Sequence, residues 1–316
     1  MAGDEAVITP PKFSDPAITA KGETRAWVDP VALNTLWFNT GTLCNIACTN
    51  CYIESSPTND ALVYITAAEV QDYLDQLEQR NWGVSEIGFT GGEPFMNPEM
   101  IEMARACLER GYEVLILTNA MAPMMRPKVK DGLIGLQRDF GSRLTLRISV
   151  DHWSAAMHDT ERGTGAFEKT LRGMRWLRDQ GIQMAVAGRT VWDETDAQSR
   201  DGYAALYERE GFAIDAANPA TTMLFPEMDE AAEVPEITTD CWGILEKSPD
   251  SVMCASSRMV VKRKGAARPA VLACTLLPYD AEFEMGETLE EAERDVSLNH
   301  PHCAKFCVLG GASCSG

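Results

Sequence analysis

The sequence predicts an α/β fold in which parallel strands alternate with helices, followed by a smaller, cysteine-rich C-terminal part. Between residues 36 and 225, short apolar runs alternate with segments of helical periodicity, and this rhythm stops after Pro226. Six of the ten cysteines lie in the last quarter of the chain. Strand–helix alternation of this kind builds a parallel sheet with helices outside it, closed into a full or partial barrel.

The expected elements can be placed along the chain in order. An irregular arm covers 1–35, and strands are expected within 36–44, 83–90, 112–119, 143–151, 182–192 and 212–225. A capping box at Thr66–Glu69 starts the first helix, and further helices are expected at 97–111, 124–139, 166–181 and 197–211. The acidic stretch 227–240 is typical of a linker. The predicted division is therefore an arm (1–35), a barrel (36–226) and a linker with a C-terminal domain (227–316).

Composition narrows the choice of partner and compartment. The 316 residues include 28 Lys and Arg against 47 Asp and Glu, a formal net charge of −19. Such a surface repels phosphate backbones and anionic lipids, so we expect neither nucleic acid nor a membrane as a partner. No apolar run is long enough to cross a membrane and no secretory signal is visible. We therefore expect a cytoplasmic protein, whose cysteines are metal ligands or redox groups rather than disulfides.

Three cysteines stand directly after the first expected strand. Cys44, Cys48 and Cys51 form the pattern C-x3-C-x2-C. Three thiolates on one tight loop can hold three irons of a four-iron cluster and leave the fourth iron open, as a catalytic metal site requires. The alternative is a zinc knuckle or a set of unlinked buried thiols. Zinc usually takes four ligands, which favours the cluster.

The stretch TLCNIACTNCY (42–52) resembles the signature of the radical SAM superfamily, in the branch with a C-terminal auxiliary-cluster domain of SPASM or twitch type. The resemblance implies an enzyme with a partial (β/α)6 TIM-like barrel, a [4Fe-4S] cluster on the triplet, and S-adenosylmethionine on the open iron. One electron then cleaves the sulfonium, and the resulting 5′-deoxyadenosyl radical abstracts hydrogen from substrate. A reductant such as flavodoxin or ferredoxin is implied as a partner. Tyr52 fits the signature, whereas Asn50 stands where many members have an aromatic residue.

Further motifs follow the strands in the order that the family shows. The resemblance assigns the GGEP motif to the methionine amino group and Arg162, in HDTERGTGAF, to the methionine carboxylate, which a guanidinium suits geometrically. Ser149 and Asp151 are candidates for the ribose hydroxyls, and Arg189 and Thr190 are expected to face the adenosine. Taken singly, such residues also occur as turns, caps or surface groups. The candidate cofactor-binding residues are Tyr52, Gly91, Gly92, Glu93, Asn119, Ser149, Asp151, Arg162 and Thr190. Ala120 departs from the glycine common after Asn119.

A second set of cysteines lies near the C-terminus. Cys254 and Cys274 flank two β-like runs around KGAARP, which predict a hairpin that brings the two thiols together. The resemblance to twitch or SPASM domains implies one auxiliary [4Fe-4S] cluster, held by these two with Cys303 and Cys307. Cys314 is the alternative fourth ligand, and structural zinc is the alternative metal. The sequence leaves the role of Cys241 open.

Two substrate classes are compatible with these motifs. We expect hydrogen abstraction from a small molecule, for net oxidation or rearrangement, similar to the reactions of the aminocyclitol dehydrogenases and the molybdopterin-precursor enzyme of the same branch. A peptide substrate, as in SPASM-type peptide maturases, is the alternative; only 35 residues precede the barrel, which favours the small molecule. A non-catalytic metal-binding or electron-transfer protein is a third interpretation. It is disfavoured because an electron carrier has no use for a nucleoside site.

Overall fold

The computed structural model of the chain describes residues 10–80, 82–227 and 229–310. One sheet of nine strands runs through it in the order β10-β9-β8-β2-β3-β4-β5-β6-β7. Six consecutive strands of this sheet are parallel, as predicted: β2 (Thr35–Asn39), β3 (Glu86–Thr90), β4 (Glu113–Thr118), β5 (Leu144–Ser149), β6 (Gln183–Arg189) and β7 (Thr222–Phe225). The two outermost strands of the sheet do not pair with each other, so the sheet does not close into a full barrel. The predicted partial barrel is confirmed.

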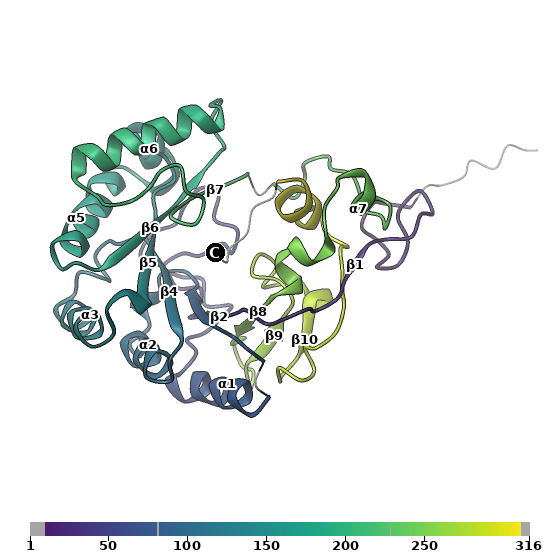
Figure 1. Cartoon of the computed structure of the whole chain (residues 1–316), viewed down its shortest axis with the longest axis horizontal. Helices are drawn as coiled ribbons and strands as arrows, with labels where there is room; N and C mark the ends of the chain where they lie inside the picture. Colours follow the sequence, from purple (N-terminus) through teal and green to yellow (C-terminus); the bar gives the residue numbers. More distant parts are fainter. Residues whose placement is uncertain (1–9, 81, 228, 311–316) are drawn as a thin grey trace, which may run out of the picture.

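Helices cover the outer side of this sheet (Figure 1). They are α1 (Ala67–Arg80), α2 (Met100–Glu109), α3 (Pro127–Phe140), α4 (Ala155–Arg162), α5 (Ala166–Asp179) and α6 (Asp196–Glu210). The capping box expected at the start of α1 is present, because the Glu69 amide donates to Thr66 Oγ1 (3.2 Å) and the Thr66 amide to Glu69 Oε2 (3.0 Å). These two bonds satisfy amides that the first helical turn leaves without a partner.

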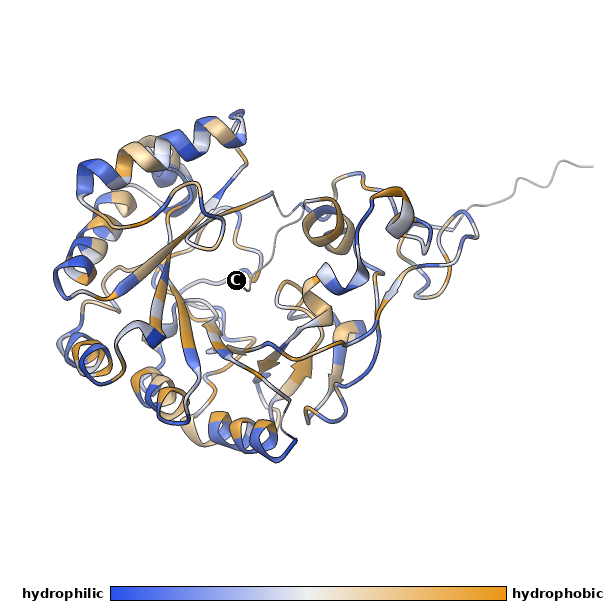
Figure 2. Cartoon of the chain, viewed as in Figure 1, coloured by the Kyte–Doolittle hydropathy of each residue, from blue (hydrophilic) through white to orange (hydrophobic). Residues whose placement is uncertain are grey.

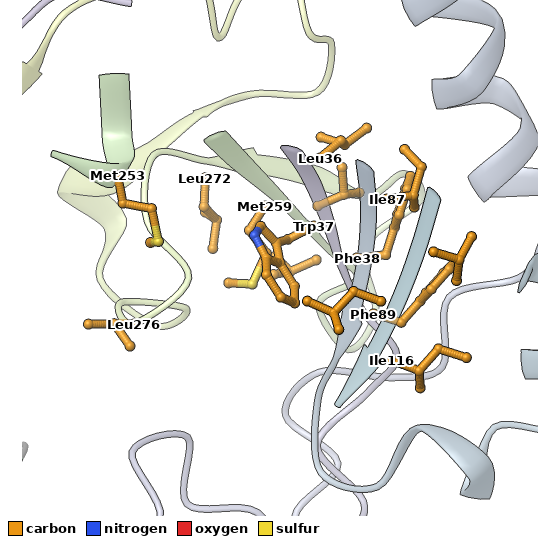
Figure 3. Packing of buried hydrophobic residues seen from close by; sticks show 14 of the residues in the cluster. Leu36, Trp37, Phe38, Ile87, Phe89, Ile116, Met253, Met259, Leu272 and Leu276 are labelled. Atoms are coloured by element: carbon orange, nitrogen blue, oxygen red, sulfur yellow. The ribbon is translucent and has the colours of Figure 1, made fainter. Parts of the chain in front are cut away.

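The core lies between the sheet and the helices. Apolar residues gather along the strands and on the helix sides that face them (Figure 2). Phe38 of β2 stacks on Phe89 of β3 with ring centroids 5.7 Å apart and meets Tyr73 of α1 edge-on. Trp37, the neighbour of Phe38, points to the opposite side of the sheet, toward Met259 (Figure 3). Successive side chains of β2 thus point to opposite sides of the sheet, as the pleat of a strand requires.

The C-terminal part extends the same sheet. Strand β8 (Ser257–Val261) pairs in parallel with β2, β9 (Ala270–Leu272) is antiparallel to β8, and β10 (Glu284–Gly286) is antiparallel to β9. The β8–β9 pair is the hairpin predicted around KGAARP. Its parallel attachment to β2 was not predicted. The boundary expected after residue 226 stays a prediction.

Short elements complete the C-terminal part. They are α7 (Cys241–Ile244), the π-helix Cys303–Leu309, and 3-10 turns at Pro249–Ser251, Met253–Ala255 and Ala281–Phe283. Two more 3-10 turns, Pro94–Met96 and Gly141–Arg143, lie in the barrel. Within the described residues, no helix is both long enough and apolar enough to cross a membrane.

The N-terminal arm and the acidic stretch 227–240 are fastened together by a buried ion pair. Strand β1 (Trp27–Val28) pairs with β11 (Val296–Ser297), and just before it Arg25 Nη2 lies 2.6 Å from Glu236 Oε1. The Arg25 side chain is fully buried, and that of Glu236 is 6% exposed. Burial raises the pKa of Glu236, but bonds from the Phe13 and Ala20 amides and from Arg25 outweigh it, so the pKa lies below its usual range.

Replacing Arg25 by Met should therefore lower the free energy of unfolding by about 3–5 kcal/mol, because Glu236 is left as an unpaired buried charge. The double variant Arg25→Met/Glu236→Leu should lose less than Arg25→Met alone. Urea unfolding followed by circular dichroism measures both. The control Arg138→Met removes an arginine that is 74% exposed, and its effect should stay within about 0.5 kcal/mol. A loss below about 1 kcal/mol for Arg25→Met would contradict this account.

Candidate functional site

The three triplet cysteines line one cavity at the carboxyl ends of the parallel strands. Every strand from β3 to β7 contributes a residue at or just after its end. Seven of the nine candidate cofactor-binding residues lie in the same wall: Tyr52, Gly91, Gly92, Asn119, Ser149, Asp151 and Arg162. The carboxyl end is the edge at which parallel α/β barrels hold their chemistry. The structure thus gathers residues that are far apart in the sequence around Cys44, Cys48 and Cys51.

The glycine pair of the GGEP motif lets β3 approach the backbone that leads into the cysteine loop. A Cβ on Gly91 would lie 2.6 Å from the Gly41 carbonyl oxygen, and one on Gly92 would lie 2.3 Å from that of Leu43. In return the Gly92 amide donates to Gly41 O (2.8 Å) and the Glu93 amide to Leu43 O (3.1 Å). Gly91 also has a φ of +137°, which favours glycine. The pair therefore fixes the start of the cysteine loop.

Glu93 and Thr190 do not line the cavity. Glu93 is buried behind it, where its carboxylate accepts from Thr118 Oγ1 (2.8 Å), the Asn119 amide (2.9 Å) and the Phe95 amide (3.2 Å). Burial raises the pKa of Glu93 and these bonds oppose the rise. Thr190 is exposed, and its amide donates to Phe225 O (2.9 Å). Glu93 thus shapes the end of β4, and Thr190 joins the ends of β6 and β7.

The turn after β4 has a left-handed residue at its centre. Ala120 has a φ of +56°, a conformation that costs an L-residue about 1–2 kcal/mol and glycine little. This backbone explains why glycine is common at the position in the family that the sequence resembles. A Cβ on Gly173 of α5 would lie 2.0 Å from the Ala120 oxygen, so α5 packs tightly on the turn.

Two arginines, Arg162 and Arg189, line the same cavity together with the carboxylates of Asp151 and Glu161. Arg162 contacts Asp151 with two parallel bonds, Nε to Oδ2 (2.6 Å) and Nη2 to Oδ1 (2.9 Å). Arg189 Nε lies 3.7 Å from Asp151 Oδ1, and Nη2 donates to Asn50 O (2.5 Å) in the cysteine loop. Burial raises the pKa of Asp151, but the two guanidiniums outweigh it and hold that pKa below its usual range.

The triplet thiols are partly or fully buried, and burial changes the pKa values of Cys44 and Cys48. Burial raises the pKa of Cys44 to about 12, and Glu93 and the other two thiols act in the same direction. Burial also raises the pKa of Cys48, although Arg162 and Arg189 oppose the rise. The Ser55 amide donates to Cys51 Sγ (3.3 Å), and Asn119 Nδ2 lies 3.9 Å from Cys44 Sγ.

The four C-terminal cysteines predicted to act together line a second, almost wholly apolar cavity. Its walls are Val252, Met253, Cys254, Cys274, Leu276, Phe283, Val296, Leu298, His302, Cys303 and Cys307. Burial raises the pKa of Cys303, and the nearby Cys274 and Cys254 raise it further. Cys241 is not part of this wall; it accepts a bond from the Thr238 amide (3.4 Å). Cys314 lies outside the described residues.

The two cavities share a wall. Leu276 lines both of them. Phe225, which lines the barrel cavity, stacks on Phe306 between Cys303 and Cys307, with ring centroids 5.5 Å apart. Tyr279 Oη donates to Ile53 O (2.9 Å), two residues after Cys51. Sequence reasoning missed Leu276, Phe225 and Tyr279, because no local pattern connects them with the barrel.

Both cysteine sets fit iron–sulfur clusters by the chemistry of their donors. Thiolates are the ligands that such clusters require, and each set faces a single cavity. Within 10–80, 82–227 and 229–310, no three Cys, His, Asp or Glu side chains converge closely enough to hold a single metal ion.

Comparison with known families agrees with this geometry. The profile of the Radical SAM superfamily matches residues 38–198, about half of the chain. The chain belongs to the radical SAM superfamily. The resemblance to its SPASM or twitch branch is also confirmed, with a [4Fe-4S] cluster, S-adenosylmethionine and an auxiliary cluster as the cofactors of that type of enzyme. Which residues hold them stays a prediction.

The curated relatives match about half of the chain. The Bacillus subtilis (strain 168) antilisterial bacteriocin subtilosin biosynthesis protein AlbA is 30% identical over 158 residues, 48% of this chain and 33% of that protein. The AdoMet-dependent heme synthase of Methanosarcina barkeri is 32% identical over 43% of this chain and 36% of its own. Mycofactocin maturase MftC of Mycobacterium ulcerans is 27% identical over 54% and 43%. The match thus spans about a third to two fifths of these relatives.

Solved structures agree over more of the chain. Streptococcus suis SuiB bound to S-adenosylmethionine has a TM-score of 0.59 at 12% identity and covers 81% of this chain and 63% of SuiB. The anSMEcpe structure with bound AdoMet has a TM-score of 0.57 at 14% identity, covering 82% and 79%. At such low identities the likeness concerns the fold alone.

A methyl group at Gly92 should disturb the cysteine loop. Gly92→Ala places a carbon against the Leu43 carbonyl, and we expect a loss of about 1–3 kcal/mol in the free energy of unfolding together with less iron per chain after reconstitution. The matched control is Gly243→Ala in α7, where nothing lies within 4 Å of the new carbon. Wild-type iron content and stability in Gly92→Ala would show that the close approach does not matter.

Proposed function

We propose that Cys44, Cys48 and Cys51 hold three irons of a [4Fe-4S] cluster, and that the chain uses S-adenosylmethionine to abstract hydrogen from an organic substrate. The observation that supports this most is the shared cavity, in which the three thiols face Ser149 and the Asp151–Arg162–Arg189 group. When bound and reduced, the cluster supplies the electron that cleaves the sulfonium to a 5′-deoxyadenosyl radical. The protein's part is to hold the reacting groups close together and keep water away.

The cavity residues divide into those that bind and those that position. Ser149 lines the cavity with a hydroxyl suited to the ribose. The backbone of Gly91 and Gly92 is proposed to receive the methionine amino group. Glu93 is a positioning residue, because its carboxylate is occupied by Thr118 and two backbone amides. It acts by fixing Asn119 beside Cys44.

We propose an auxiliary [4Fe-4S] cluster on Cys254, Cys274, Cys303 and Cys307. The support is that these four thiols share one apolar cavity, separated from the barrel cavity by Leu276. In a net two-electron oxidation, the substrate loses a hydrogen atom and then one further electron and a proton. A site one side chain away is suited to receive that electron. A reductant such as flavodoxin or ferredoxin and a reducing compartment such as the cytoplasm complete the proposal, because the ligands must stay thiolates.

For the substrate we propose a small molecule, with a peptide as the second candidate. The peptide gains support from the relatives, since AlbA and MftC are named for bacteriocin biosynthesis and mycofactocin maturation, and SuiB has been solved with the precursor peptide SuiA. Transfer of deuterium from labelled candidate substrates into 5′-deoxyadenosine distinguishes the two classes.

Anaerobic reconstitution tests the assignment of both cysteine sets. The wild type should bind about eight irons, and Cys44→Ala/Cys48→Ala/Cys51→Ala should retain about four. Only proteins with an intact triplet should form 5′-deoxyadenosine from S-adenosylmethionine after reduction.

The variant Cys254→Ala/Cys274→Ala should lose the other four irons yet keep some cleavage. The control is Cys107→Ala, a cysteine buried in α2 that faces neither cavity. Stoichiometric zinc in place of iron, or no 5′-deoxyadenosine from the reduced wild type, would refute the proposed function.

A further inference from the structure

The two arginines of the barrel cavity differ in how far their hydrogen bonds are already satisfied. Arg162 directs its Nε–Nη2 edge at both oxygens of Asp151, an arrangement that uses the bidentate face of a guanidinium. Arg189 has no such partner. Its Nη2 donates to the Asn50 carbonyl, and its Nη1, buried from solvent, has no hydrogen-bond partner among the described residues.

The charges are distributed in the same uneven way. One carboxylate, Asp151, faces two guanidiniums, and it lies 2.6 and 2.9 Å from Arg162 nitrogens but 3.7 Å from the nearest Arg189 nitrogen. The other carboxylate of this wall, Glu161, accepts from the Asn50 side chain (2.9 Å), so the charge of Arg189 is the less compensated of the two guanidinium charges. The side chain of Arg189 is 13% exposed, so water does little to stabilise that charge. A buried donor without a partner is costly unless a ligand satisfies it.

Arg189 is also held in place independently of any ligand. Its amide donates to the Asp151 carbonyl (3.0 Å), which joins the ends of β5 and β6, and its Nη2 is anchored on the cysteine loop. The side chain thus lies in the cavity wall between Asn50 of the cysteine loop and Asp151. A guanidinium that is fixed, buried and partly unsatisfied is suited to a carboxylate.

We propose that Arg189 binds the carboxylate of the methionine part of S-adenosylmethionine, and that Arg162 is a positioning residue paired with Asp151. The inference rests on the proposed function. It changes the assignment made from the sequence, in which Arg162 takes the carboxylate and Arg189 faces the adenosine. The reason is that the fork of Arg162 is occupied by a carboxylate of the protein itself.

Decarboxylated S-adenosylmethionine tests this assignment, because it lacks the carboxylate and keeps the sulfonium, amine and adenosine. Dissociation constants of both compounds are measured on the cluster-loaded protein by calorimetry and by the change in the spectrum of the reduced cluster. In Arg189→Gln, affinity for S-adenosylmethionine should fall about tenfold to a hundredfold, and affinity for the decarboxylated compound should stay within about twofold. Contacts between the carboxylate and iron contribute equally in both proteins, so they cancel in this comparison.

Arg189→Lys should recover part of the lost affinity, since the charge returns without the fork. The surface variant Arg138→Gln serves as control and should bind both compounds like the wild type. An unchanged ratio of the two affinities in Arg189→Gln would overturn the inference. So would equal weakening of both compounds, which would mean that Arg189 acts only by anchoring the loop at Asn50. If the wild type binds neither compound, the proposed function itself has failed.

Discussion

A buried thiol becomes a metal ligand only as a thiolate, and burial opposes that charge; the rest of the barrel site depends on this constraint. Cys44 shows it most clearly, because burial raises its pKa to about 12. Metal binding at such thiols is coupled to the release of their protons. The nearby guanidiniums of Arg162 and Arg189 act in the other direction on Cys48. In a chain with a net charge of −19, this concentration of positive charge is local and belongs to the site.

The cysteine loop has little regular structure of its own and is held by its neighbours. The glycine pair after β3 binds its start through Gly41 and Leu43. Asn50 bonds to Glu161 of α4 (2.9 Å) and to Arg189 of β6, which secures the stretch before the last cysteine. These contacts come from several strand ends, so the loop is positioned by the barrel as a whole. A rigid scaffold that orients a loop is the common arrangement in catalytic sites.

The sequence predicted those structural features that are encoded by residues close together in the chain. The capping box at Thr66, the six parallel strands and the hairpin between Cys254 and Cys274 all follow from patterns within a few residues, and the structure contains each of them. The parallel pairing of β8 with β2 joins segments more than 200 residues apart, and no local pattern encodes it. Hydrogen-bond occupancy is likewise invisible in a sequence. Arg162 and Glu93 stand in the right motifs, yet the structure shows their polar groups engaged by the protein itself.

The continuation of the barrel sheet into β8 has a consequence for how the chain can be divided. Without β8, the outer edge of β2 would present a row of free amides and carbonyls beside the first strand of the catalytic barrel. Exposed edges of this kind recruit other strands and lead to aggregation. A fragment that stops near the end of β7 would contain every barrel motif, and we would still expect it to aggregate through the exposed edge of β2. The C-terminal part thus protects the barrel from self-association, whatever chemistry its cysteines add.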